Sequence, residues 1–346
     1  GIMQWHQQPD GQWVSEKNPG YPFLAVLFKK LGALRLAPLF FGVFGCIGLW
    51  FGAKRWIGEW GAAFAVSMYC SASAAMVFAW RETMPTFTDT SLLACGIGLL
   101  IWAVLSVERR IRIRVIVGSL AFFSLGLAMF VRYTSITVLV VAALFAAFAC
   151  SVTRWGLPRW ALAIWASVVL VPVGMALCFN AIYYGSFTKT GYLPGVIGFS
   201  LSAIPTSIRE LPWRLAEAMP VFLVALAAIV VMVRLQLNLR KVQVGSEEVG
   251  TQAKWIDEDQ GSLTLTSETA ISDRWIGLFL VCCWVSTWGL YVGFVWTSQV
   301  IEGAEVHGIG AYTFTRLFVP SLAPIALLAA WLLVRLPRVI ALLILA

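Results

Sequence analysis

Long apolar runs recur along nearly the whole chain, and they limit the folds that it can adopt. Each run is close to the roughly 20 residues with which a helix crosses the hydrocarbon core of a bilayer. Backbone groups inside a bilayer must find partners within the chain, so such runs form helices. The sequence predicts an all-α, polytopic transmembrane domain of about nine spans, at 36–53, 58–80, 90–107, 113–131, 134–152, 160–179, 218–235, 275–296 and 317–334.

Composition indicates a single membrane domain over residues 1–346. Hydrophobic residues make up 60% of the chain and charged residues 12%, whereas about 25% of the residues of a soluble domain are charged. The net charge of +8 comes mostly from short basic loops, so we expect no nucleic-acid partner. All seven cysteines lie in apolar stretches without a CxxC pair, and there are two histidines. This pattern indicates neither a disulfide framework nor a metal site.

Basic residues are unevenly divided between the two sets of alternating loops. Ten Lys and Arg occupy the 22 positions of four short loops, 54–57, 108–114, 153–159 and 335–338. The loops of the opposite side hold ten over about 105 positions. Because Lys and Arg collect in cytoplasmic loops, the four short loops are predicted to be cytoplasmic. Residues 1–35, with an interfacial helix at 21–34, and the loop 180–217 are then outside.

Two longer segments differ from the spans in character. Residues 236–274 are polar and acidic, and we expect a poorly ordered cytoplasmic insertion there. In the outer loop 180–217, the stretch 195–218 mixes apolar and polar residues and contains Pro205 and Pro212. A helix-turn-helix resting on the membrane face is the structure expected for this stretch.

Five segments on the predicted outer side carry residues that membrane insertion does not explain. They read EKNPGYPF at 16–23, RETMPTFTDTS at 81–91, VRYTS at 131–135, NAIYYGSFTKTGY at 180–192 and TRLFVP at 315–320. In this order, the set resembles the GT-C superfamily of membrane glycosyltransferases over about residues 12–334. The nearest branch holds the protein O-mannosyltransferases and the lipid A aminoarabinose transferase.

The resemblance implies a GT-C-like fold and a glycosyltransferase at the outer membrane face. Its donor would be a polyprenyl-phosphate-linked sugar, and its acceptor a protein, a glycolipid or a glycan. Members begin with a span and an acidic loop that carries the expected catalytic base and, in some branches, binds a divalent metal. The chain is expected to lack this first span and loop, so we name no base and assign no cofactor.

The resemblance also implies roles for individual residues. Asp89 matches the acidic residue that heads the fourth span, and it is the candidate catalytic residue. By the same resemblance, Lys17, Arg132 and Arg316 would lie near the donor phosphate, and arginine suits this role because it binds phosphate oxygens with two parallel hydrogen bonds. The candidate donor- and substrate-binding residues are Lys17, Arg81, Glu82, Arg132, Tyr133, Tyr192 and Arg316.

Each of these residues also has a structural interpretation. Arg132 and Arg316 are equally consistent with interfacial anchors whose side chains reach the headgroups. Thr88-Asp89-Thr90 is a favourable capping sequence, so Asp89 is consistent with a helix N-cap. Lys17 fits a solvated loop, Arg81 and Glu82 fit a surface pair, and the tyrosines fit an interfacial aromatic belt.

Two other functions are compatible with the sequence. A transporter or flippase of a lipid-linked or anionic substrate also carries basic residues within its membrane domain. Such proteins usually place their charged positions near the bilayer midplane and show repeat symmetry, whereas the charged residues here lie at the outer ends of spans. A non-catalytic GT-C-like subunit is the other alternative. Short loops favour a bacterial or archaeal plasma membrane over the endoplasmic reticulum.

Overall fold

The computed structural model describes residues 5–7, 13–15, 18–81, 84–190, 198–248, 267–295 and 315–345. Within them, the regular structure is helical apart from a short antiparallel hairpin of β1 (Trp5–Gln7) and β2 (Trp13–Ser15) and an isolated antiparallel bridge between Phe199 and Phe294. Seven of the described helices are long and apolar enough to cross a bilayer, and a helix pair bent by 111° makes an eighth candidate span. The predicted all-α, polytopic fold class is confirmed.

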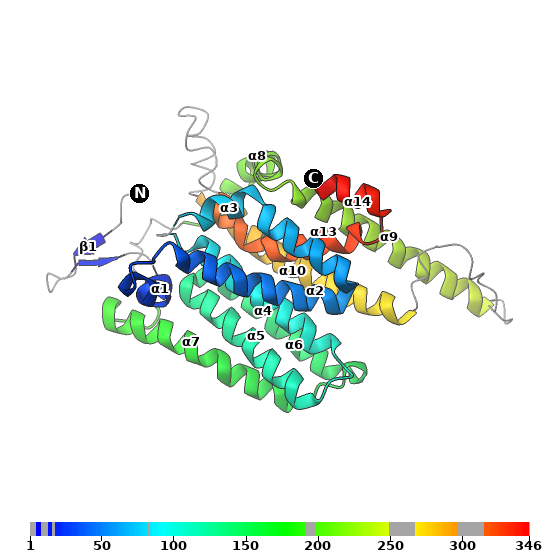
Figure 1. Cartoon of the computed structure of the whole chain (residues 1–346), viewed down its shortest axis with the longest axis horizontal. Coiled ribbons are helices and arrows are strands. Elements are labelled where there is room, and N and C mark those ends of the chain that lie inside the picture. Colours follow the sequence, from blue (N-terminus) through cyan, green and yellow to red (C-terminus); the bar gives the residue numbers. More distant parts are fainter. Residues whose placement is uncertain are drawn as a thin grey trace.

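The helices form a bundle whose layout is drawn in Figure 1. They are α1 (Gly20–Lys30), α2 (Leu36–Ser71), α3 (Ser73–Ala79), α4 (Thr86–Leu105), α5 (Ile111–Val131), α6 (Ile136–Ser151), α7 (Trp160–Tyr184), α8 (Ala203–Ala218), α9 (Val221–Glu248), α10 (Ser267–Val292), α12 (Thr315–Phe318), α13 (Leu322–Leu333) and α14 (Arg338–Leu345). Short 3-10 turns lie at η1 (Tyr133–Ser135), η2 (Thr153–Trp155) and η3 (Val319–Ser321).

Helix α2 covers the first predicted span, 36–53, and most of the second, 58–80, which continues into α3. Its 36 residues would extend about 54 Å as one straight helix, well beyond a hydrocarbon core of about 30 Å. Gly58 breaks it with φ 80° and ψ −177°, a backbone region that favours glycine. The Sγ atoms of Cys46 and Cys70, one on each arm, are 3.4 Å apart. The two arms therefore form a hairpin, which turns back toward α3 in Figure 1.

Helices α4 and α13 form the centre of the bundle. In the most apolar window of α4, 83% of the residues are buried, and in that of Thr315–Leu333, which ends with α13, 89% are buried. The value for α7, which lies at the edge in Figure 1, is 17%. Glycines let α2 and α4 approach closely. A Cβ atom on Gly48 would lie 2.4 Å from Cys95 Cα, and one on Gly98 would lie 2.0 Å from the Gly48 carbonyl oxygen.

One end of the bundle gathers the short basic loops. The Arg55 guanidinium donates to the Leu105 carbonyl at 3.0 and 3.1 Å and pairs with Glu108. The Arg154 guanidinium donates to Ser272 Oγ at 3.2 Å. Loops that are far apart in sequence therefore share this end, as the predicted topology requires. We refer to it as the basic end.

The predicted insertion 236–274 is more helical than we expected. Helix α9 continues to Glu248, and α10 begins at Ser267. Asp273, expected in a solvated loop, is buried. It accepts hydrogen bonds from Trp56 Nε1 (2.8 Å), Trp331 Nε1 (2.9 Å) and the Arg335 guanidinium (2.6 Å). The polar composition misled the prediction because these three partners come from distant parts of the chain and satisfy the carboxylate at the basic end.

The stretch 195–218 also differs from its prediction. Within its described residues, it forms one helix, α8, rather than a helix-turn-helix. Pro205 is in the first turn, where a backbone N–H has no intrahelical acceptor, so proline is tolerated. Pro212 lies inside the helix without ending it. Ile208 and Trp213 are exposed, whereas Leu211 and Leu215 are buried, which makes α8 amphipathic before the 111° bend into α9.

Candidate functional site

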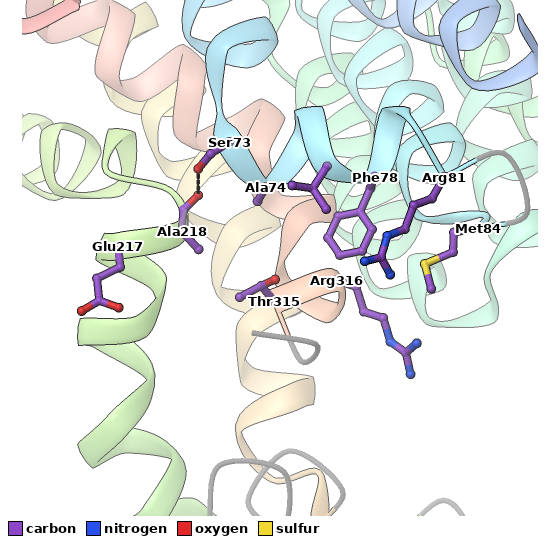
Figure 2. A pocket seen from close by; sticks show the side chains of 10 residues that line it. Ser73, Ala74, Phe78, Arg81, Met84, Glu217, Ala218, Thr315 and Arg316 are labelled. Atoms are coloured by element: carbon purple, nitrogen blue, oxygen red, sulfur yellow. Dashed lines mark hydrogen bonds between the residues drawn. The ribbon is translucent and has the colours of Figure 1, made fainter. Parts of the chain in front are cut away.

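A pocket of about 420 Å³ lies at the end of the bundle opposite the basic end. Four stretches of chain form it: helix α3, the connection from α3 to α4, the end of α8 and helix α12. Figure 2 shows how these elements surround the pocket. Its lining residues are Ser73, Ala74, Val77, Phe78, Arg81, Met84, Glu217, Ala218, Thr315 and Arg316.

Two arginines give part of the wall a positive charge. Arg81 and Arg316 are far apart in sequence, and their side chains lie on the same part of the pocket in Figure 2. Glu217 lies across Thr315 from them in that view. A guanidinium fork matches the geometry of phosphate oxygens. This wall is therefore suited to a phosphate group.

The remaining wall near the arginines is apolar. Val77 and Phe78 on α3 and Met84 before α4 line it. Helix α3 is held against the end of α8 by Ser73, whose Oγ donates to the Ala218 carbonyl at 2.8 Å (Figure 2). An apolar wall beside a cationic one suits a molecule that has both a charged head and a hydrocarbon tail.

Asp89 is buried and is not among the residues that line this pocket. Its Oδ1 atom accepts a hydrogen bond from Ser135 Oγ at 2.6 Å, and Oδ2 is buried with no partner among the described residues. Asp89 also lies within electrostatic range of Arg132. Asp89 therefore does not touch the pocket directly, and its link to the pocket is through the neighbouring Arg132.

The N-cap interpretation of Asp89 is wrong. Helix α4 begins at Thr86, and the Asp89 backbone N–H donates to the Pro85 carbonyl at 2.9 Å. Asp89 therefore lies inside the first turn. Proline has a fixed φ that is already compatible with a helix, and Pro85, at φ −72°, starts α4 one turn earlier than the capping sequence suggested.

Arg132 connects the end of α5 to the pocket. Its Nη1 atom donates to the Arg316 carbonyl at 3.0 Å, and its guanidinium lies 5.3 Å from the ring centroid of Tyr291. The hydroxyl of Tyr291 donates to Thr134 Oγ1 at 2.6 Å. Arg132 thus holds the backbone of the residue whose side chain lines the pocket.

The other candidates divide into two groups. Tyr133 donates from its hydroxyl to Asn180 Oδ1 at 2.5 Å, so it contacts α7 and is not among the residues that line the pocket. Lys17, Glu82 and Tyr192 lie outside the described residues. The structure therefore brings Arg81 and Arg316 into one pocket. Arg132 is bonded to the backbone of Arg316, and Asp89 lies within electrostatic range of Arg132.

Several pocket residues were missed by the sequence analysis. Ser73 and Thr315 are small polar residues next to apolar runs, and Glu217 is an isolated carboxylate just before a predicted span. A polar residue inside or next to an apolar run is the signal that would have selected them. No group of three or more His, Cys, Asp or Glu side chains that could hold a metal occurs in the part of the chain that the structure describes.

Comparisons with known proteins give a structural match only. No known protein family and no curated protein matches the sequence. Two solved structures of ArnT from Cupriavidus metallidurans match the fold: the apo state, with a TM-score of 0.55 and 15% identity, and the state bound to undecaprenyl phosphate, with 0.53 and 16%. Both matches cover 93% of this chain and 50% of the ArnT chain. The chain has a GT-C-like fold. It spans about half the length of the proteins that it matches.

Proposed function

We propose that this chain takes part in glycosyl transfer from a polyprenyl-phosphate-linked sugar to a protein, lipid or glycan acceptor. The observation that carries the proposal is the pocket in which Arg81 and Arg316 form a cationic wall beside the apolar wall of α3. Such a pocket matches the head and tail of a lipid phosphate. The match to an ArnT structure bound to undecaprenyl phosphate supports the same ligand class.

The reaction needs the leaving group to be stabilised. The acceptor oxygen attacks the anomeric carbon, the bond to the donor phosphate breaks, and a general base removes the acceptor proton. Negative charge then develops on the lipid phosphate. Arg81 and Arg316 are placed to stabilise this charge in a partly enclosed site, where preorganised cations act most strongly.

We also propose that the pocket opens at the outer membrane face. The support is the distribution of basic residues, which collect at the other end of the bundle and so favour the cytoplasm for that end. A cysteine introduced at position 200, in a background without the seven native cysteines, should react with an impermeant thiol reagent added from outside. If that cysteine does not react in intact cells but does react in opened membranes, position 200 faces the cytoplasm and the proposed orientation is wrong.

Substitution of the pocket arginines should weaken lipid phosphate binding. Arg316→Gln and Arg81→Gln should each raise the Kd for undecaprenyl phosphate about tenfold, which corresponds to about 1.4 kcal/mol. Each glutamine keeps polarity and most of the length but removes the charge and the fork. Binding is measured on the purified chain in detergent by intrinsic tryptophan fluorescence.

Arg209→Gln is the matched control. Arg209 is also an arginine of the outer-end region, but 86% of its side chain is exposed on α8, and it does not line the pocket. Its loss should change the Kd less than twofold. Equal weakening by all three substitutions would mean that general attraction of the anionic lipid, rather than the pocket, accounts for binding.

Asp89→Asn should act on turnover rather than on donor binding. The variant keeps the shape of the side chain but weakens its hold on Ser135 and removes the charge near Arg132. We expect kcat of the full-length enzyme to fall about tenfold, because small errors in position cost at least that much, while the donor KM stays within threefold. Unchanged kcat would remove Asp89 from the reaction. If the fall in kcat is matched by a fall in the folded fraction, measured by thermal unfolding, the role of Asp89 is purely structural.

A further inference from the structure

Two thiols meet inside the hairpin of α2. The Sγ atoms of Cys46 and Cys70 are 3.4 Å apart, and each residue lies on a different arm. A disulfide bond is about 2.05 Å long, so the two sulfur atoms need to approach by roughly 1.3 Å.

The pair is more accessible than three of the other five cysteines, and Cys178 and Cys282 are exposed as well. Cys70 is exposed and Cys46 is half-buried, whereas Cys95, Cys150 and Cys283 are buried. Both arms belong to a helix that is long and apolar enough to cross a bilayer, so we infer that an exposed side chain on it faces lipid. Reagents that reach this pair are therefore those that dissolve in the bilayer.

The pair also lies next to the pocket. The helix breaks at Ala72, with φ −59° and ψ 117°, two residues after Cys70. Helix α3 begins immediately after this break, and Ser73, Ala74, Val77 and Phe78 from α3 line the pocket. A covalent bond from Cys70 to Cys46 would anchor the base of that wall to the first arm of the hairpin.

We propose that Cys46 and Cys70 are a redox modification site that closes to a reversible disulfide when a membrane-soluble quinone oxidises it. The two S–H bonds break and one S–S bond forms. Two electrons and two protons pass to the quinone, which is reduced to the hydroquinone. The proposal rests on the geometry of the hairpin and does not depend on the proposed glycosyl transfer.

The test is direct detection of the cross-link. Membranes that contain the full chain are treated with tetramethylbenzoquinone, whose ring has no free position for thiol addition. Free thiols are then alkylated under denaturing conditions, and the protein is digested with trypsin. Cleavage after Arg35, Lys54, Arg55 and Arg81 gives peptides 36–54 and 56–81, and each contains one of the two cysteines. We expect these peptides to be joined, with a mass two hydrogens below their sum, and to separate again with dithiothreitol.

The control is Cys178, which is exposed on α7. Cys178→Ser should leave the cross-link intact, whereas Cys70→Ser should abolish it and leave Cys46 alkylated. The wild-type Cys178 should remain alkylated throughout. The proposal is overturned if Cys46 and Cys70 are alkylated equally with and without the quinone. It is also overturned if Cys70 forms a disulfide with Cys178 as often as with Cys46, because the cross-link would then come from random collision and not from the contact between Cys46 and Cys70.

Discussion

Gly98→Ala is expected to destabilise the protein by more than about 3 kcal/mol, beyond the usual range for overpacking. The added Cβ would lie 2.0 Å from the Gly48 carbonyl oxygen and 2.3 Å from its carbonyl carbon. Both are backbone atoms, so no side chain can rotate away, and α2 and α4 must separate. The measurement is the thermal unfolding of the purified protein in detergent, followed by size-exclusion chromatography to quantify the folded fraction.

Gly174→Ala is the matched control for this substitution. Gly174 lies in the spanning helix α7, and a Cβ added there meets no atom within 4 Å. Alanine favours a helix over glycine by up to about 1 kcal/mol, so this variant should be as stable as the wild type or slightly more stable. If Gly98→Ala melts within two or three degrees of Gly174→Ala, the close packing of α2 on α4 is not what holds the bundle together.

Arg114→Met is expected to cost about 3 kcal/mol or more, since hydrogen bonds to charged groups contribute about 1.5–3 kcal/mol each. The buried guanidinium of Arg114 donates to the carbonyls of Ala103 (2.8 Å), Val104 (2.9 Å) and Trp155 (2.7 Å). Two of these carbonyls are at the C-terminal end of α4, where no intrahelical donor is available. Methionine fills similar space but leaves all three acceptors unpaired. The readout is the melting temperature in detergent.

Arg112→Met tests whether the lost charge alone is responsible. Arg112 is exposed at the start of the same helix, and removing it changes the net charge by the same amount. We expect it to melt close to the wild type. Similar losses for both variants would show that the stability depends on the total charge of the basic end, and not on the three carbonyl contacts of Arg114.

The spans were predictable because their signal is local. A hydrophobic run of the right length must form a helix in a bilayer. Accordingly, the predicted span 113–131 ends at the same residue as α5, and 134–152 differs from η1 and α6 by one residue at each end. The predicted cytoplasmic turn at 54–57 is also next to the reversal at Gly58.

The errors arose where tertiary contacts decide the outcome. Asp273 is polar in sequence, but the indoles of Trp56 and Trp331 and the Arg335 guanidinium satisfy its carboxylate inside the bundle. Pro212 predicts a turn, yet it lies within α8. Local patterns contain no information about partners that are up to 217 residues away.

The candidate site was predictable in part. Arg81 and Arg316 were selected from separate motifs, and the structure places both in one pocket. The burial of Asp89 was not predictable, because its hydrogen-bond partner Ser135 lies 46 residues later in the sequence, in the short turn η1. Tyr133 was selected as a neighbour of Arg132, but adjacent residues point in different directions, and its hydroxyl bonds to Asn180.

The length of α9 has a practical consequence for imaging. Its 28 residues extend about 42 Å, which exceeds a hydrocarbon core of about 30 Å by roughly 12 Å. This chain of 38.0 kDa, taken alone, offers little mass outside a detergent micelle for particle alignment in electron cryomicroscopy. A compact soluble protein spliced between the end of α9 and the start of α10 would be joined through continuous helices. Such a fusion gives the particle a fixed external landmark on the side away from the pocket.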